Sequence, residues 1–271
     1  MGTMLQRHSL SPSDFGGHDG CLEMLNLTRP QLVTDVHRAY LAAGADAIET
    51  NTFGLTGLDD RLDELAEVGA RLARQAADTA STPDHPRWVL GSVGPCAREQ
   101  ACRRQVAAMI RGGIDAVLIE TGLDPPALEA QVHGAQQAAA DAAVDLPVLV
   151  CVTTRPDGTL PLGDDLEHVV SALAPLGIDG FGINCAHGLT GLRDQLARLA
   201  SAISLPLLCL PSAGLPTVTE HGLSYPIEPA EFARELADLA RTFDLALAGG
   251  CCGTTPEHIA ALVGMLAHRG F

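Results

Sequence analysis

Three cysteines carry the most specific chemistry in this sequence. Cys185 ends the stretch GFGINC, and about 65 residues later Cys251 and Cys252 stand side by side in GGCCGTTP. Three thiolates that converge on one point form a site for a soft metal ion, and zinc is the ion that favours such ligands. Adjacent cysteines on a regular strand point to opposite faces, so both reach one ion only where the backbone turns. The surrounding glycines permit that turn, and the spacing predicts a zinc site made of these three residues.

Two carboxylates are the next candidates. Glu49 and Glu120 each follow a short apolar run and precede polar residues. A carboxylate in such a place can bind an ammonium group or act as an acid or base; the alternative is a solvated strand end. His187, just downstream of the GINC motif, is a weaker candidate ligand, and a structural role in its loop is favoured. Cys151 and Cys209 lie inside apolar runs and are predicted to be small core residues.

Apolar runs that alternate with amphipathic segments must position these residues. Stretches of the form Gly-x-Asp followed by an apolar run begin at Gly44, Gly113 and Gly177, and each interval of about 65–70 residues fits two βα units. Further runs typical of buried parallel strands span 88–95, 147–154, 206–214 and 245–253. Helices are predicted at 30–43, 57–80, 99–112, 125–143, 165–176, 190–203, 229–243 and 256–268. Thr28 and Thr255 each stand just before a proline-led helix and are predicted to cap it.

This alternation predicts an α/β protein with a (β/α)8 TIM-type barrel over a single domain, residues 1–271. Eight helices but only seven strands are found, so the first strand is expected to be truncated or missing, upstream of Met1. In such barrels the active site lies at the carboxyl ends of the strands, where the three cysteines and both glutamates are placed. The open sheet edge predicts a homo-oligomer or a partner that covers it.

Composition excludes several classes of function. The chain has 271 residues, 17 basic and 33 acidic, with a formal net charge of −16. No basic cluster is present, so binding to nucleic acid or to an anionic membrane is not expected. The sequence has no transmembrane run and no signal-peptide core, which predicts a cytoplasmic protein whose cysteines bind metal or catalyse rather than form disulfides. Nucleotide-binding and zinc-protease motifs are also missing.

Several motifs together resemble a known family. GINC followed by GGCCGTTPEHI, with GADAIETNTFG, GSVGP, IDAVLIET and PSAGLP in the same order, is similar to the zinc-dependent homocysteine S-methyltransferases. The likeness is strongest to the homocysteine-binding module of cobalamin-dependent methionine synthases and covers nearly the whole chain. It implies a methyltransferase of methionine biosynthesis, in which a zinc-bound homocysteine thiolate attacks a methyl donor to give methionine.

The resemblance also implies roles for individual residues. Cys185, Cys251 and Cys252 would be the zinc ligands, with the homocysteine sulfur in the fourth place. Glu120 would receive the amino group of the substrate. Other pocket residues would be Glu49, Asn51, Thr52 and Ser212. The family normally has an asparagine where Ser212 stands, so the pocket is expected to differ there.

The methyl donor and the acceptor stay open at this point. Because no folate or cobalamin module follows in this sequence, the donor is expected to be external: S-methylmethionine, S-adenosylmethionine, a betaine or a methyl-corrinoid protein. The family also normally has a first strand whose aspartate helps to form the pocket. Three alternatives remain: methyl transfer to a different thiol or selenol, a non-catalytic zinc-binding partner subunit, and a metal-free enzyme that uses Glu49 and Glu120.

Overall fold

The structure, a computed structural model, describes residues 1–55, 58, 60–219 and 222–267. The chain divides into two compact units, which are described one at a time. Unit 1 comprises Met1–Ile119 and Pro126–Leu149, and unit 2 comprises Glu120–Pro125 and Val150–Phe271. That residues 1–271 form a single barrel domain stays a prediction.

Parallel strands alternate with helices along the described chain. The strands of the main sheet follow the order β1-β2-β3-β4-β5-β6-β9. Their bounds are β1 Ala47–Glu49, β2 Trp88–Val93, β3 Ala116–Gly122, β4 Val148–Val152, β5 Gly180–Cys185, β6 Leu207–Pro211 and β9 Leu247–Ala248. The long helices are α3 Pro30–Ala42, α4 Leu62–Ala80, α5 Glu99–Gly112, α6 Pro125–Ala142, α7 Leu166–Leu173, α8 Leu192–Ala202, α9 Pro229–Phe243 and α10 Pro256–Ala267. This order confirms the predicted α/β class, a (β/α)8-type topology in which no strand of the described residues precedes β1.

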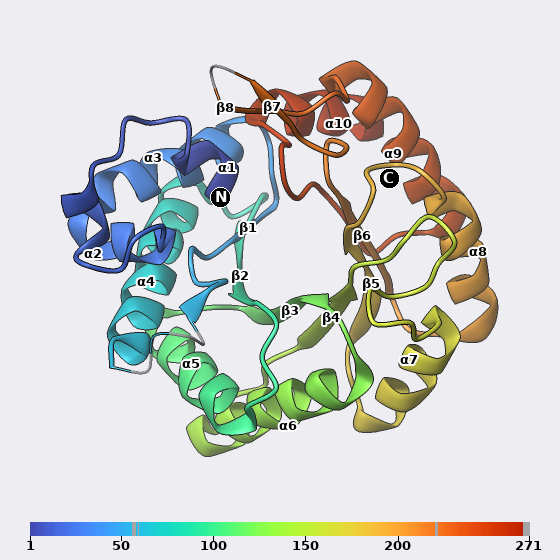
Figure 1. Ribbon diagram of the computed structural model, residues 1–271, viewed down its shortest axis with the longest axis horizontal. Coiled ribbons are helices and arrows are strands. Elements are labelled where there is room, and N and C mark those ends of the chain that lie inside the picture. The colour runs from blue at the N-terminus through green and yellow to red at the C-terminus, as the bar shows by residue number, and fades with distance from the viewer. Residues whose placement is uncertain (56–57, 59, 220–221, 268–271) are drawn as a thin grey trace. The chain divides into compact units, whose positions relative to one another are not determined.

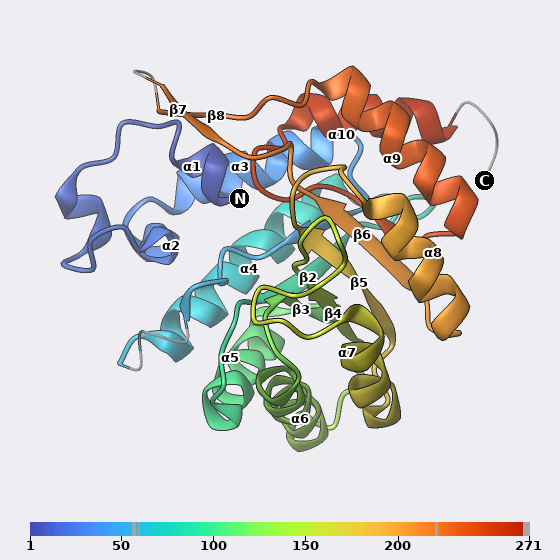
Figure 2. The same ribbon diagram turned by 45° about the vertical axis from the view of Figure 1, so that its right-hand side comes forward.

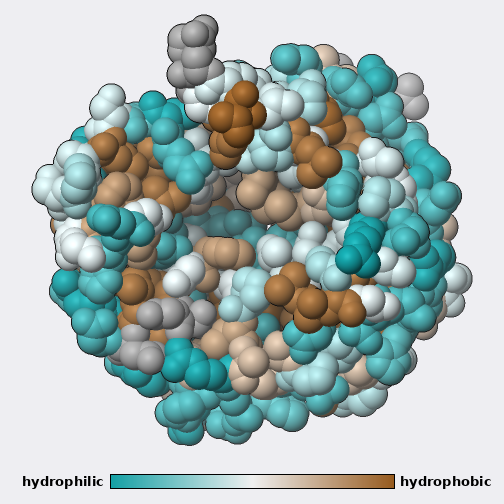
Figure 3. Space-filling view, viewed as in Figure 1, coloured by the Kyte–Doolittle hydropathy of each residue, from teal (hydrophilic) through white to brown (hydrophobic). Residues whose placement is uncertain are grey.

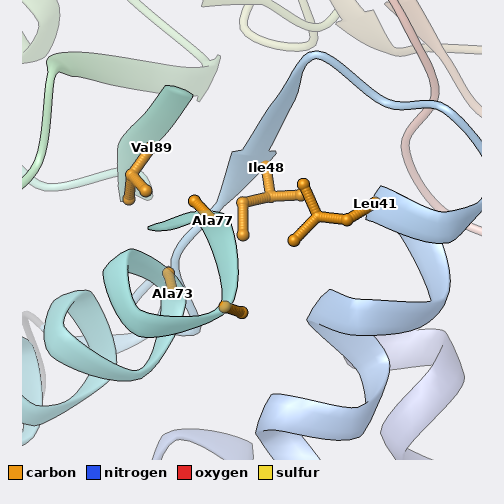
Figure 4. Packing of buried hydrophobic residues seen from close by; sticks show 6 residues of the cluster. Leu41, Ile48, Ala73, Ala77 and Val89 are labelled. Atoms are coloured by element: carbon orange, nitrogen blue, oxygen red, sulfur yellow. The ribbon is translucent and has the colours of Figure 1, made fainter. Parts of the chain in front are cut away.

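Unit 1 packs its helices against one side of its strands. In Figure 1, α4, α5 and α6 lie outside β1, β2 and β3. The register pairs Ile48 of β1 with Val89 of β2. Side chains of both strands pack with Leu41 of α3 and with Ala73 and Ala77 of α4, as Figure 4 shows. The small alanines let α4 approach the sheet closely, as the alanine-rich sequence suggests.

The N-terminal segment contains short helices that the sequence analysis did not predict. They are α1 Gly2–Leu5, η1 Pro12–Phe15, η2 Leu22–Met24 and α2 Leu25–Thr28. The prediction that Thr28 caps the next helix is wrong, because Arg29 holds the N-cap position of α3. The Thr28 hydroxyl instead donates to the carbonyl of Asp14 at 2.6 Å and to that of Met24 at 3.2 Å. The Thr28 hydroxyl therefore stabilises the turn that contains α2 and does not cap α3. Part of the predicted helix 57–80 and the end of the predicted helix 256–268 lie outside the described residues.

Unit 2 holds β5, β6 and β9 with α7 to α10 on their outer side (Figure 1). Strand β6 pairs in parallel with β5 on one edge and with β9 on the other. A hairpin that was not predicted, β7 Thr217–Thr219 with β8 Gly222–Ser224, extends away from this sheet (Figure 2). All six of its strand residues are exposed, so the alternation of buried and exposed side chains that identifies a strand in a sequence is missing.

The face shown in Figure 3 is mainly hydrophilic, with hydrophobic residues in separate patches. None of the described helices combines the length and the apolar composition that crossing a membrane requires.

Cys151 and Cys209 are completely buried in β4 and β6, which confirms them as core residues.

Candidate metal centre

The three predicted cysteines come together in unit 2. The sulfur atoms of Cys185, Cys251 and Cys252 all lie within 4.8 Å of one another. In a tetrahedral zinc site the metal–sulfur distance is about 2.3 Å, which places ligand sulfurs about 3.8 Å apart. Cys185 and Cys251 are half-buried and Cys252 is exposed, so a fourth ligand can approach from solvent. The spacing and the donor type both fit a zinc ion.

Strand β6 sets the distance between the cysteines, because its end lies between the two segments that carry them. The backbone N–H of Cys251 donates to the carbonyl of Pro211, and the N–H of Ser212 donates to the carbonyl of Cys185, both at 2.9 Å. The N–H of Ala213 donates to the carbonyl of Cys252 at 2.8 Å. Both cysteine segments are thus tied to three consecutive residues at the carboxyl end of β6.

The backbone turns at the adjacent cysteines, as their shared site requires. The N–H and the hydroxyl of Thr254 both donate to the carbonyl of Cys251, at 3.2 and 2.7 Å. Gly253 lies between them with φ +79°, a conformation that favours glycine. Cys185 itself has φ +59°, and this uncommon conformation for a residue with a side chain redirects the backbone at the end of β5. Both cysteine segments therefore leave regular strand geometry where the sulfurs meet.

The three thiols affect one another's ionisation strongly. Hydrogen bonds with Cys185 and with Cys251 lower the pKa of Cys252 far below the usual range of a thiol. Hydrogen bonds with Cys185 and Cys252, together with burial, raise the pKa of Cys251. Without a cation, one thiolate is stabilised by neighbouring S–H groups, while a second negative charge beside it is disfavoured. A divalent cation removes this conflict, so the donor set is suited to a metal.

Glu120 lies at the end of β3 and belongs to the same unit as the cysteines. Its side chain is buried, and its Oε2 accepts a hydrogen bond from Nδ2 of Asn184 at 3.1 Å. The same nitrogen lies 3.9 Å from Sγ of Cys251. A buried carboxylate is therefore connected to a cysteine of the cluster through one amide side chain. Asn184 was not among the predicted site residues, although the GINC motif placed it next to Cys185.

The other predicted residues of unit 2 lie beside the cluster without joining it. The Ser212 hydroxyl donates to the carbonyl of Gly214 at 3.2 Å and lies 3.5 Å from that of Ala186. Nδ1 of His187 lies 3.4 Å from the carbonyl of Thr154. Among the described residues, the group suited to a metal consists of the three cysteines and does not include His187.

Tyr225 is a residue near the cluster that the sequence analysis missed. A Cβ placed on Gly253 would collide with its ring, so the ring lies directly over the backbone that follows the two cysteines. Burial and the nearby thiolates of Cys252, Cys185 and Cys251 raise the pKa of its phenol. Ile227 fixes the segment that follows Tyr225. Its N–H donates to the carbonyl of Ala213, and its own carbonyl lies 2.9 Å from Nε2 of His258.

Glu49, Asn51 and Thr52 belong to unit 1. Nδ2 of Asn51 donates to the carbonyl of Leu22 at 2.9 Å and to Oδ1 of Asn26 at 3.0 Å. The Thr52 hydroxyl donates to the carbonyl of Ser92 at 2.7 Å. Asn51 and Thr52 are buried and Glu49 is half-buried. These contacts hold the loop after β1 in place, and a direct substrate role for the three residues stays a prediction.

Comparison with known proteins identifies the family. The profile described as Homocysteine S-methyltransferase matches residues 1–266, which is almost the entire chain. The chain belongs to the homocysteine S-methyltransferase family. The resemblance inferred from the motifs is thereby confirmed.

Two similar proteins, one of them in two structures, illustrate the range of this family. The methionine synthase of Mycobacterium leprae is 40% identical over 286 residues, which cover 98% of this chain and 24% of that relative. The apo form of the homocysteine methyltransferase MmuM from Escherichia coli is 25% identical, with a TM-score of 0.70 over 94% of this chain and 93% of that one. Its metallated form has a TM-score of 0.75 at 24% identity, over 99% and 94% of the two chains, and supports the fold. The chain thus spans about a quarter of the length of the curated relatives it matches.

Proposed function

We propose that this chain is a zinc-dependent homocysteine S-methyltransferase module that forms methionine. The observation that carries the proposal is the group of three cysteine sulfurs within 4.8 Å of one another, in a chain of this family. Relatives named methionine synthase and homocysteine methyltransferase support methyl transfer to homocysteine as the reaction.

The cysteines provide a place where the substrate thiol becomes reactive. Cys185, Cys251 and Cys252 would hold the zinc ion. When bound, zinc lowers the pKa of a coordinated thiol, so that a thiolate nucleophile is available at neutral pH. The exposed side of the cluster, at Cys252, leaves room for a substrate sulfur. The ring of Tyr225 covers the backbone of Gly253 on the same segment.

Glu120 would orient the substrate by binding its ammonium group. A buried carboxylate is costly unless it is hydrogen-bonded or paired with a positive charge. Asn184 supplies one such hydrogen bond, and the substrate ammonium would supply the charge. Because the same amide lies near Cys251, a homocysteine held at Glu120 would present its thiol toward the cluster.

The methyl donor would come from outside the described chain. S-methylmethionine, S-adenosylmethionine, a betaine and a methyl-corrinoid protein are the candidates that the sequence analysis named. The M. leprae relative, of which this chain covers 24%, is named methionine synthase, which supports methionine as the product and does not separate these donors. A homo-oligomer, or a partner at the open sheet edge, stays part of the proposal.

Metal analysis combined with a donor screen tests this function. We expect about one zinc per chain, loss of zinc in the Cys185→Ala, Cys251→Ala and Cys252→Ala variants, and retention in Cys209→Ala, which removes a buried thiol outside the cluster. Zinc-loaded protein should bind homocysteine in a calorimeter and form methionine with at least one donor. Full zinc occupancy without homocysteine binding would contradict the proposal. Preference for another thiol in a panel would indicate a different acceptor, and zinc binding without transfer to any thiol would indicate a non-catalytic subunit.

A further inference from the structure

Asn184 is the residue that connects the two parts of the proposed site. It lies at the penultimate position of β5, directly before Cys185, and only 1% of its surface is exposed. We infer that Asn184 is a positioning residue that couples occupation of the amino-group site at Glu120 to the metal ligand Cys251. This inference rests on the proposed function, because it gives Glu120 the role of binding the substrate amine.

The hydrogen bonds of Asn184 define the orientation of its amide. Oδ1 accepts from the backbone N–H of Thr121 at 2.8 Å. Nδ2 lies 3.1 Å from Oε2 of Glu120 and 3.1 Å from the hydroxyl of Thr121. An amide turned the other way would place its oxygen against a carboxylate and its donors against an N–H, so only one orientation satisfies both partners.

Asn184 also supports a strained backbone next to Glu120. Thr121 has φ +59°, an uncommon conformation that is unfavourable for a β-branched side chain. Such strain persists when the surroundings hold it, and it is concentrated at functional sites. Oδ1 of Asn184 holds the Thr121 N–H, and Nδ2 lies against its hydroxyl. The same side chain therefore contacts both the Glu120 carboxylate and the strained residue that follows it.

The two N–H bonds of Asn184 face three acceptors, and this creates the coupling. Besides Glu120 and Thr121, Nδ2 lies 3.9 Å from Sγ of Cys251, within the range of a weak N–H···S bond. An amide nitrogen has only two hydrogens to share among these acceptors. When an ammonium group pairs with the Glu120 carboxylate, the carboxylate becomes a weaker acceptor for the Asn184 amide. The amide N–H then forms a stronger bond to the sulfur of Cys251. Because linkage is reciprocal, a metal on Cys251 changes the affinity of the amino-group site by the same factor.

Two variants test the role of the amide. Asn184→Leu keeps a side chain of similar size but removes both N–H donors and the acceptor for the Thr121 N–H, and it places no second carboxyl group beside Glu120. Asn184→Ala removes the entire amide. The matched control is Gln195→Ala, which removes a buried amide of the same unit that bonds to Thr154 and to the Arg155 carbonyl, without contacting the cluster or Glu120.

The decisive measurement is calorimetric binding of homocysteine and of 4-mercaptobutanoate, the same thiol without its amino group, to zinc-loaded protein. Zinc content and thermal stability are measured in parallel for every variant. We expect wild type to prefer homocysteine and both Asn184 variants to lose about tenfold of that preference, as expected for one charge-assisted hydrogen bond. Gln195→Ala should keep the full preference even if it is less stable. Glu120→Gln should remove the preference, and adding Asn184→Ala to it should cause no further loss, because the two residues act through one interaction.

The outcomes distinguish this inference from the proposed function. Wild-type protein that binds zinc but not homocysteine would overturn both. Wild-type protein that prefers homocysteine, with Asn184→Leu keeping zinc and the same preference, would overturn only the positioning role. Asn184→Leu decides the question if Asn184→Ala does not fold, because the volume of the side chain is nearly preserved. Additive losses in the double variant would also contradict the coupling.

Discussion

The ring of Tyr225 lies over the backbone of Gly253, the residue that follows the two adjacent cysteines. A side chain at Gly253 would therefore disturb both the turn and the packing of the Tyr225 ring against it.

Gly253→Ala should destabilise the metal centre. The new methyl group would collide with Tyr225 and would sit on a backbone with φ +79°, so we expect a loss of about 1–3 kcal/mol in the free energy of unfolding and weaker zinc binding. Urea denaturation and zinc competition with a chelator measure the two effects. The control is Gly264→Ala in α10, where nothing lies within 4 Å and the change should be neutral or stabilising by up to about 1 kcal/mol. Equal effects at the two glycines would contradict this prediction.

Alkylation of the metal-free protein should be selective for Cys252. Its thiol is exposed, and hydrogen bonds with Cys185 and Cys251 lower its pKa, so the thiolate persists below neutral pH. We expect its reaction with iodoacetamide to change little between about pH 8 and pH 6, whereas an ordinary thiol with a pKa of about 8.5 slows about tenfold per unit. Burial raises the pKa of Cys21 to about 11, so Cys21 should react slowly over the same range. Peptide mass spectrometry identifies the modified residue, and added zinc should protect Cys252.

His37 should make the stability of the protein depend on pH. It is buried in α3 and Nε2 has no hydrogen-bond partner among the described residues; burial lowers its pKa to about 3. In the unfolded chain His37 binds a proton at about pH 6.5, whereas in the folded chain it stays neutral. Its contribution to the free energy of unfolding is therefore complete above that pH and is lost as the pH falls toward the folded pKa. At about pH 5 the loss should be about 2 kcal/mol. His37→Leu should remove this part of the pH dependence in urea denaturation, and His8→Gln, at an exposed position, should not. An unchanged dependence in His37→Leu would show that another group is responsible.

Asn26→Ala should loosen the loop after β1. Nδ2 of this buried residue donates to the carbonyls of Asn51 at 2.9 Å and of Leu65 at 3.1 Å. Removing it leaves buried acceptors unsatisfied and should cost about 1–3 kcal/mol in the free energy of unfolding. If Asn51 and Thr52 contribute to substrate binding, the KM for homocysteine should rise as well. Gln31→Ala, which breaks an exposed side-chain hydrogen bond to Asp35, is the control and should change stability by less than about 0.5 kcal/mol.

Much of the secondary structure was predictable because its signals are local. The predicted helix 30–43 is α3 Pro30–Ala42, and the predicted helix 99–112 is α5 Glu99–Gly112. Hydrophobic periodicity and a proline at the helix start are properties of a few consecutive residues. Where such signals fail, the prediction fails too: the β7–β8 hairpin is fully exposed, and Thr28 forms hydrogen bonds within the preceding turn.

The sequence by itself determined which residues could bind a soft metal, since three cysteines near glycine-rich strand ends are chemically specific wherever the chain places them. Only the tertiary structure decided that the end of β6 ties the segments of Cys185 and Cys251 together. It also decided that Asn184 contacts Glu120, 64 residues away in the chain. Such contacts depend on which strands pair and where the backbone leaves regular geometry. Pairing between distant segments results from packing of the whole unit, and no local pattern of residues records it.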